Sequence, residues 1–135
     1  MESESVLVYE QRVGGSWDAC TQSLVDWVNT NIANVNQILD ITATTTSNTD
    51  ECLFAVYYTK SPNTVMPAYP KGTKLSFFLH RGKASWVASE KEVSAVVESK
   101  VKDRSFFRMA SACSTPEPEY DNIIIIFYWV FPWTH

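Results

Sequence analysis

The chain has few of the residues that build nucleotide, metal or nucleophilic sites. Its 135 residues include only four glycines, two histidines and three cysteines. The glycines form neither a G-x-x-x-x-G-K-[ST] nor a G-x-G-x-x-G pattern, which argues against a phosphate-binding loop. There is no G-x-S-x-G elbow, and separated cysteines without a D-x-D cluster argue against a dedicated metal site. We therefore expect no resident metal or cofactor, and no motif names a reaction.

The three cysteines, Cys20, Cys52 and Cys113, are an odd number without a C-x-x-C pair. They are typical of reduced, small apolar residues in a cytosolic protein rather than of a disulfide framework. The first ten residues contain neither the basic segment nor the long apolar segment of a signal peptide. We expect a cytoplasmic location, which would be the host cytoplasm for a viral or phage protein.

Charge is also scarce. Charged residues make up 19% of the chain, the net charge is −4 and the pI is near 5.1. The basic residues are scattered, whereas a surface that follows nucleic-acid phosphates needs clustered lysines and arginines. We therefore expect no nucleic-acid partner.

The longest apolar run lies at the end of the chain. Residues 123–131 are nine continuous apolar residues, and Pro132 ends the run. A helix that crosses a membrane needs ~20 such residues. This segment is thus too short for a membrane anchor, and we expect no membrane partner.

Apolar periodicity divides the chain into two similar halves joined by a proline-rich connector. Residues 5–60 and 74–131 each follow the order strand, helix, strand, strand, and the connector covers 61–73. A shift of 69 residues places Arg12 on Arg81 and Ser16-Trp17 on Ser85-Trp86. The sequence therefore predicts an internal duplication.

The starts of the two helices leave alternatives open. The second helix can begin at Ser85, or only at Ser89, because Ser89 and Glu92 form an S-x-x-E capping box. In another interpretation the glycines just before Trp17 and Trp86 turn β-hairpins. Both tryptophans would then be strand residues.

The predicted fold is one α+β domain spanning residues 1–135. Two tandem βαββ units would pair into one mainly antiparallel sheet, with both helices on one face of a two-layer sandwich. The apolar stripes of the helices would then supply the core layer.

The last strand is apolar on both faces, whereas a sheet covered on one face alternates apolar with polar residues. Its aliphatic face suits packing against helices and consists of Ile124, Ile126, Tyr128 and Val130. Its other face becomes aromatic towards the end of the chain. That face needs a second cover, which could be a ligand, the connector or another subunit. We place this strand away from the sheet edge.

These considerations give a candidate site on the aromatic face. A groove would be lined by Tyr58, Phe127, Trp129 and Phe131, with His80 or Glu119 at its rim. Large aromatic area with few polar groups suits a small hydrophobic ligand, so we predict a non-catalytic binding module. The alternative is a homo-oligomeric structural protein that uses the same face as a subunit interface. A hydrolase that uses His80 ranks third.

The duplicated arrangement resembles the gyrase-inhibitor-like small-molecule-binding fold, which SOUL haem-binding proteins share in outline. In "KGTKLSFFLHRGKASW" (71–86), Gly72 precedes a strand, and His80 with Gly82 forms the H-x-G before a helix. The first half lacks that H-x-G. The resemblance implies a cleft between the halves for hydrophobic, often cationic compounds, formed by aromatic residues and a carboxylate. A second resemblance, to dodecins and short sporulation proteins, implies oligomers.

Overall fold

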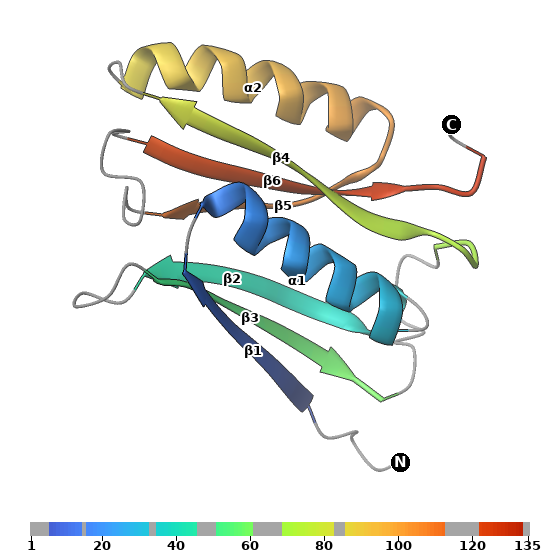
Figure 1. Cartoon of the computed structure of the whole chain (residues 1–135). Coiled ribbons are helices and arrows are strands. Elements are labelled where there is room, and N and C mark those ends of the chain that lie inside the picture. Colours follow the sequence, from blue (N-terminus) through green and yellow to red (C-terminus); the bar gives the residue numbers. More distant parts are fainter. Residues whose placement is uncertain are drawn as a thin grey trace.

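Two three-stranded antiparallel sheets and two helices form the molecule (Figure 1). The computed structural model describes residues 6–14, 16–32, 35–45, 51–60, 69–82, 86–112 and 122–133. The first sheet has the order β1-β3-β2 and contains β1 (Val6–Gly14), β2 (Ile38–Thr45) and β3 (Glu51–Thr59). The second has the order β4-β6-β5 and contains β4 (Lys74–Gly82), β5 (Phe106–Ala112) and β6 (Asn122–Val130). The helices are α1 (Trp17–Asn31), α2 (Trp86–Lys102) and the short 3-10 helix η1 (Val35–Gln37).

The α+β class is confirmed, and both halves have the predicted order of elements. The hairpin alternative is wrong, because α1 begins at Trp17 and α2 begins at Trp86. The capping-box interpretation of Ser89 is also wrong, because Ser89 lies inside α2. The duplication as an evolutionary event stays a prediction.

α1 forms where capping and amphipathic spacing coincide. Ser16 has extended backbone angles, and its Oγ accepts a hydrogen bond from the Ala19 N–H at 3.2 Å. The buried side chains of α1 recur at helical spacing and include Trp17, Cys20, Leu24 and Val28. Burial of this stripe, rather than helix propensity, provides most of the stability of such a helix.

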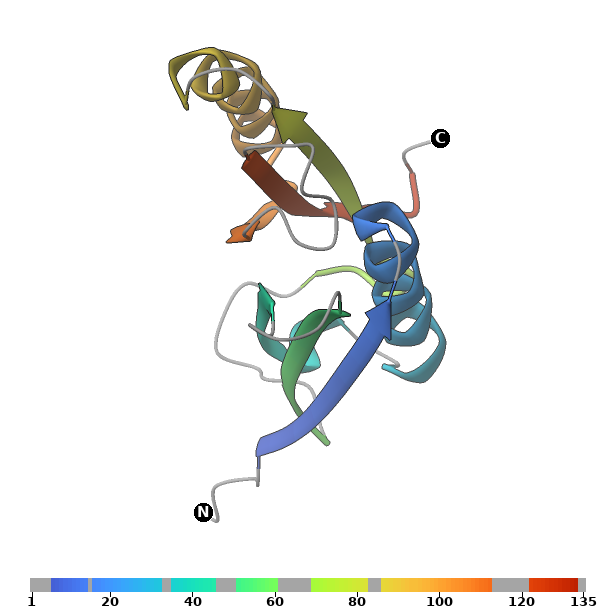
Figure 2. The ribbon, with the colours of Figure 1, turned by 60° about the vertical axis from the view of Figure 1, so that its left-hand side comes forward.

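The two sheets face each other, and the main core lies between them (Figure 2). α1 runs along one side of this sandwich and contacts β4 as well as β1 and β3. On the other side β2 and β5 approach each other, and Arg108 Nε lies 2.8 Å from Asp40 Oδ1. α1 is also joined to β4 by Arg81, whose Nη2 lies 2.6 Å from Asp18 Oδ2. Each helix–sheet unit therefore completes the core of the other.

The arrangement differs in two respects from the predicted single sheet with both helices on one face. There are two sheets, and the helices pack on opposite faces of β6. Ile123, Ile125 and Phe127 join the main core with α1, whereas Ile124 and Ile126 form a second core with Val93 of α2. The reason is that β6 is apolar on both faces, so each face takes its own cover. The predicted inner position of this strand is confirmed, since β6 is the central strand of its sheet.

The same irregularity occurs in both halves. The register shifts between Ile38 and Asp40 on β2, and between Phe106 and Arg108 on β5. Such bulges add one residue to a strand and change the face on which the following side chains lie. The shift in β5 determines the walls of the site described below.

Candidate functional site

The aromatic face of β6 is covered within the chain. Phe127 and Trp129 are buried in the main core. The Trp129 ring lies 4.6 Å from the Phe107 ring of β5 and 5.3 Å from the ring of Tyr69, which precedes β4. The end of the connector, one of the three covers expected from the sequence, thus covers this face together with Phe107 and the first unit. The binding role of Phe127 and Trp129 stays a prediction.

Only the outer end of this aromatic row reaches solvent. The half-buried Phe131 stacks with Tyr69 at 6.1 Å and with Trp133 at 5.2 Å between ring centroids. Trp133 is 67% exposed. A hollow of about 170 Å³ adjoins these rings and is also lined by Lys100, Asp103, Ser105 and Tyr128. It is small and mixed in polarity, which suits an apolar ligand poorly.

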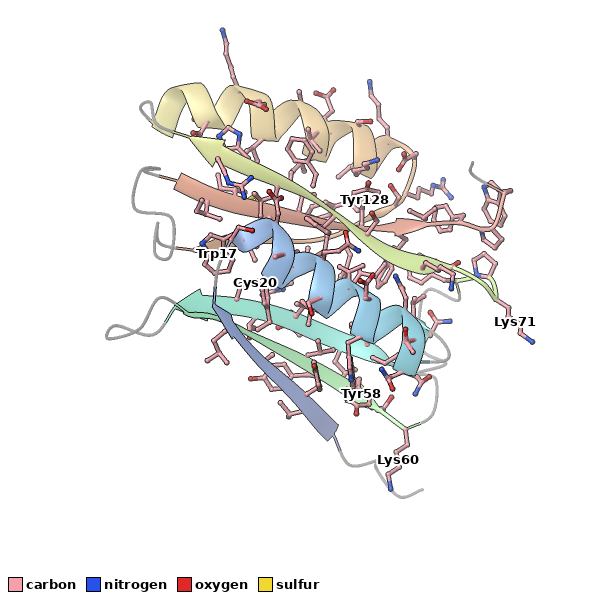
Figure 3. All side chains as sticks on the ribbon, in the orientation of Figure 1. Trp17, Cys20, Tyr58, Lys60, Lys71 and Tyr128 are labelled. Carbon is pink, nitrogen blue, oxygen red and sulfur yellow. The ribbon has the colours of Figure 1, made fainter. Side chains whose placement is uncertain are left out.

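Tyr58 belongs to a different aromatic group. It lies under the C-terminal half of α1, where its ring meets the Trp27 ring edge-on at 5.9 Å (Figure 3). Trp27 in turn stacks on Tyr9 at 3.6 Å. These rings hold α1 on the first sheet.

His80 lies on the opposite face of the second sheet from Trp129, towards α2. Its Nε2 is 3.0 Å from Ser89 Oγ, and its Nδ1 is 3.4 Å from Glu92 Oε2. The structure therefore does not bring His80 to the aromatic face. Glu119 lies outside the described residues, so its predicted place at the rim of the groove stays a prediction.

The Ser89–His80–Glu92 contacts follow the order of a catalytic triad. A hydrolytic triad needs a serine oxygen that reaches the substrate. Ser89 is only 2% exposed, so the arrangement serves as a polar connection between α2 and β4. The S-x-x-E pattern was the available sequence signal, since residues three apart share one face of a helix.

A different feature is the apolar groove between α2 and β5. We call it the α2/β5 groove. Its volume is about 430 Å³, and it is lined by Glu90, Val93, Ser94, Val97, Glu98, Val101, Lys102, Phe106 and Met109. Val101 is 55% exposed and Met109 is 46% exposed. Exposed apolar surface gathered in a hollow, rather than scattered singly, indicates a binding site.

The bulge in β5 creates one wall of this groove. Phe106 pairs with Tyr128, and Met109 pairs with Ile126, so both side chains lie on the α2 face. In a regular strand, residues three apart would point to opposite faces. The sequence alone therefore missed Met109 as a partner of Phe106.

The other wall is the face of α2 that carries valines. α2 presents Val93 and Val97 to the sheet, and only Val93 among its described residues is a buried apolar side chain. Valine reaches less far than leucine or phenylalanine, so α2 leaves the β5 side of the sheet partly open. Charged groups lie only at the rim, where Lys102 Nζ is 3.7 Å from Glu98 Oε1.

Two further classes of site are absent from the part of the chain that the structure describes. No group of three or more His, Cys, Asp or Glu side chains there could hold a metal ion. None of the helices in that part is both long enough and apolar enough to cross a membrane.

No protein-family model matches the chain, and neither a curated protein nor a solved structure does. The resemblance to gyrase-inhibitor-like proteins therefore rests on the order of elements and the short H-x-G segment alone.

Proposed function

We propose that the protein is a non-catalytic binding module that holds a small hydrophobic ligand in the α2/β5 groove. The supporting observation is the exposure of Val101 and Met109 in an apolar hollow of about 430 Å³. Ligand pockets have volumes of ~300–1,000 Å³ and mostly apolar walls. A ligand that covered these two side chains would remove them from water, which favours binding.

This location replaces the aromatic groove expected from the sequence. Phe127 and Trp129 already have partners inside the chain, so a ligand there would have to displace Tyr69 or Phe107. The α2/β5 groove needs no such rearrangement, and preformed sites avoid that cost.

The test compares two matched double variants in a titration with the neutral dye Nile red, whose fluorescence rises in apolar surroundings. V101E/M109E places two carboxylates in the groove, where a charge beside an apolar ligand is unfavourable. We expect its affinity for the dye to fall about tenfold or more. Both positions are half-exposed, so the fold should persist.

The control is V8E/L39E, which changes two apolar side chains of the first sheet that are 50% and 42% exposed. It should bind the dye like the natural chain. Equal loss in both variants, or no dye binding by the natural chain, would contradict the proposal.

A second candidate is self-association through the outer face of the first sheet. Exposure of Val8 and Leu39, on a sheet face without a helix, favours it. Interfaces between permanent subunits resemble a domain core cut in half. Light scattering should then report an oligomer for the natural chain and a monomer for V8E/L39E, whereas a natural monomer removes this candidate.

A further inference from the structure

The α2/β5 groove is long in one direction. The α2 residues that line it recur at intervals of three and four from Glu90 to Lys102. Twelve helical steps of ~1.5 Å give this strip a length of about 18 Å. The groove therefore follows the helix for more than three turns.

The groove is open to solvent along α2, as the exposure of Val101 and Met109 shows. An elongated ligand that follows the groove covers more of its apolar side chains than a compact ligand of the same volume.

The apolar walls require a ligand without polar groups along its length. Val93, Val97 and Val101 form the helical wall, and Phe106 and Met109 form the strand wall. A peptide segment would bring backbone N–H and C=O groups against these side chains, and those groups would lose their hydrogen bonds to water. An unbranched hydrocarbon chain has no such groups.

The C-terminal end of the groove has a positive charge within reach. Lys102 lines that end, and its contact with Glu98 at 3.7 Å joins two side chains that are both largely exposed. Exposed pairs of this kind are weak and exchange partners readily. Arg104 follows Lys102 closely and is exposed as well. Glu98 also lines this end, so an anionic head group binds here by taking the place of the Glu98 carboxylate at Lys102.

We propose that the ligand is a free fatty acid of about 12 carbons, with its carboxylate at Lys102 and its chain along α2 towards Glu90. An extended chain advances ~1.2 Å per bond, as the 3.3–3.6 Å over three backbone bonds shows. The 11 carbon–carbon bonds of such an acid span about 13 Å, which is most of the ~18 Å length of the groove. This inference rests on the proposed function of the same groove.

Competition with bound Nile red tests the inference, with octanoate, dodecanoate, dodecanol and adamantane carboxylate as probes. Dodecanoate should displace the dye and bind at least tenfold more tightly than octanoate, since each buried methylene adds up to about fourfold in affinity. Adamantane carboxylate, which is compact, should compete poorly.

The head group is tested by K102Q, which should weaken dodecanoate binding about threefold to tenfold and leave dodecanol unchanged. The matched control is K91Q, which removes another exposed lysine of α2 that does not line the groove. It should leave both affinities unchanged.

The outcomes separate this inference from the function on which it rests. If Nile red binds but adamantane carboxylate competes as well as dodecanoate, the fatty-acid assignment is wrong and the binding function stands. If K102Q weakens dodecanol equally, the carboxylate does not lie at Lys102. If the chain binds phosphatidylglycerol vesicles but not monomeric dodecanoate, the partner is a membrane surface. If no Nile red binds, both proposals fail.

Discussion

Arg104 adopts a backbone conformation that favours glycine. Its φ of 63° follows the end of α2. The Ser105 N–H donates to Lys100 O at 2.9 Å and the Arg104 N–H donates to Val101 O at 3.1 Å, which is the Schellman pattern. Arg104 occupies the position where glycine is usual, and a side chain there is strained.

Arg104→Gly should therefore raise the free energy of unfolding by roughly 0.5–1 kcal/mol in urea denaturation. The control is Lys102→Gly, inside the last turn of α2, which should lower it by a similar amount. A lower free energy of unfolding in Arg104→Gly would show that the backbone of Arg104 is not strained.

The pattern at Ser89 shows that a short sequence motif can fit more than one structure. The S-x-x-E pattern at Ser89 was visible, but two functions fit it, a helix cap and a connection to His80. The choice depends on where α2 starts, and α2 starts three residues earlier, at Trp86. Element boundaries of this kind are the least certain part of a sequence-based prediction.

At the scale of elements, one side chain joins α1 to the edge of the second sheet. Asn29 Nδ2 donates to Leu75 O at 3.0 Å, and the Leu75 N–H donates to Asn29 Oδ1 at 2.9 Å. The amide thus occupies the place of a neighbouring strand along β4. Such a contact satisfies two backbone groups that an edge strand would otherwise leave open.

Asn29→Ala should lower the free energy of unfolding by roughly 1–3 kcal/mol, because both backbone groups of the buried Leu75 would lose their partner. Asn31→Ala is the matched control, since the exposed Asn31 Nδ2 donates to Trp27 O within its own helix. Chemical denaturation measures both. Equal, small effects would mean that water replaces the Asn29 contact.

The position of β6 could be predicted from the sequence, whereas the bulge in β5 could not. The two-faced apolar pattern of β6 predicted its central position, because burial on both faces leaves a direct mark on composition. The walls of the α2/β5 groove could not be predicted in the same way. Alternation places Phe106 and Met109 on opposite faces, and the bulge that brings them together has no marker such as glycine in this strand.

At the scale of the whole molecule, the halves could be predicted but their packing could not. The repeated order of elements predicted two units, and nothing in either unit indicated that α1 would run along one side of two facing sheets and contact both. Periodicity shows that a face is covered and does not show by what. The aromatic face was therefore interpreted as a ligand groove, whereas Phe107 and Tyr69 cover it within the chain.

The most direct test of the binding claim is a methyl NMR titration with dodecanol, a neutral apolar ligand. Valine, leucine and methionine methyl groups report on the groove and on the outer face of the first sheet in one experiment. We predict saturable shifts at Val93, Val97, Val101 and Met109, with Val8 and Leu39 unchanged. Shifts concentrated at Val8 and Leu39, or none in the groove at saturating ligand, would contradict a binding function for the α2/β5 groove.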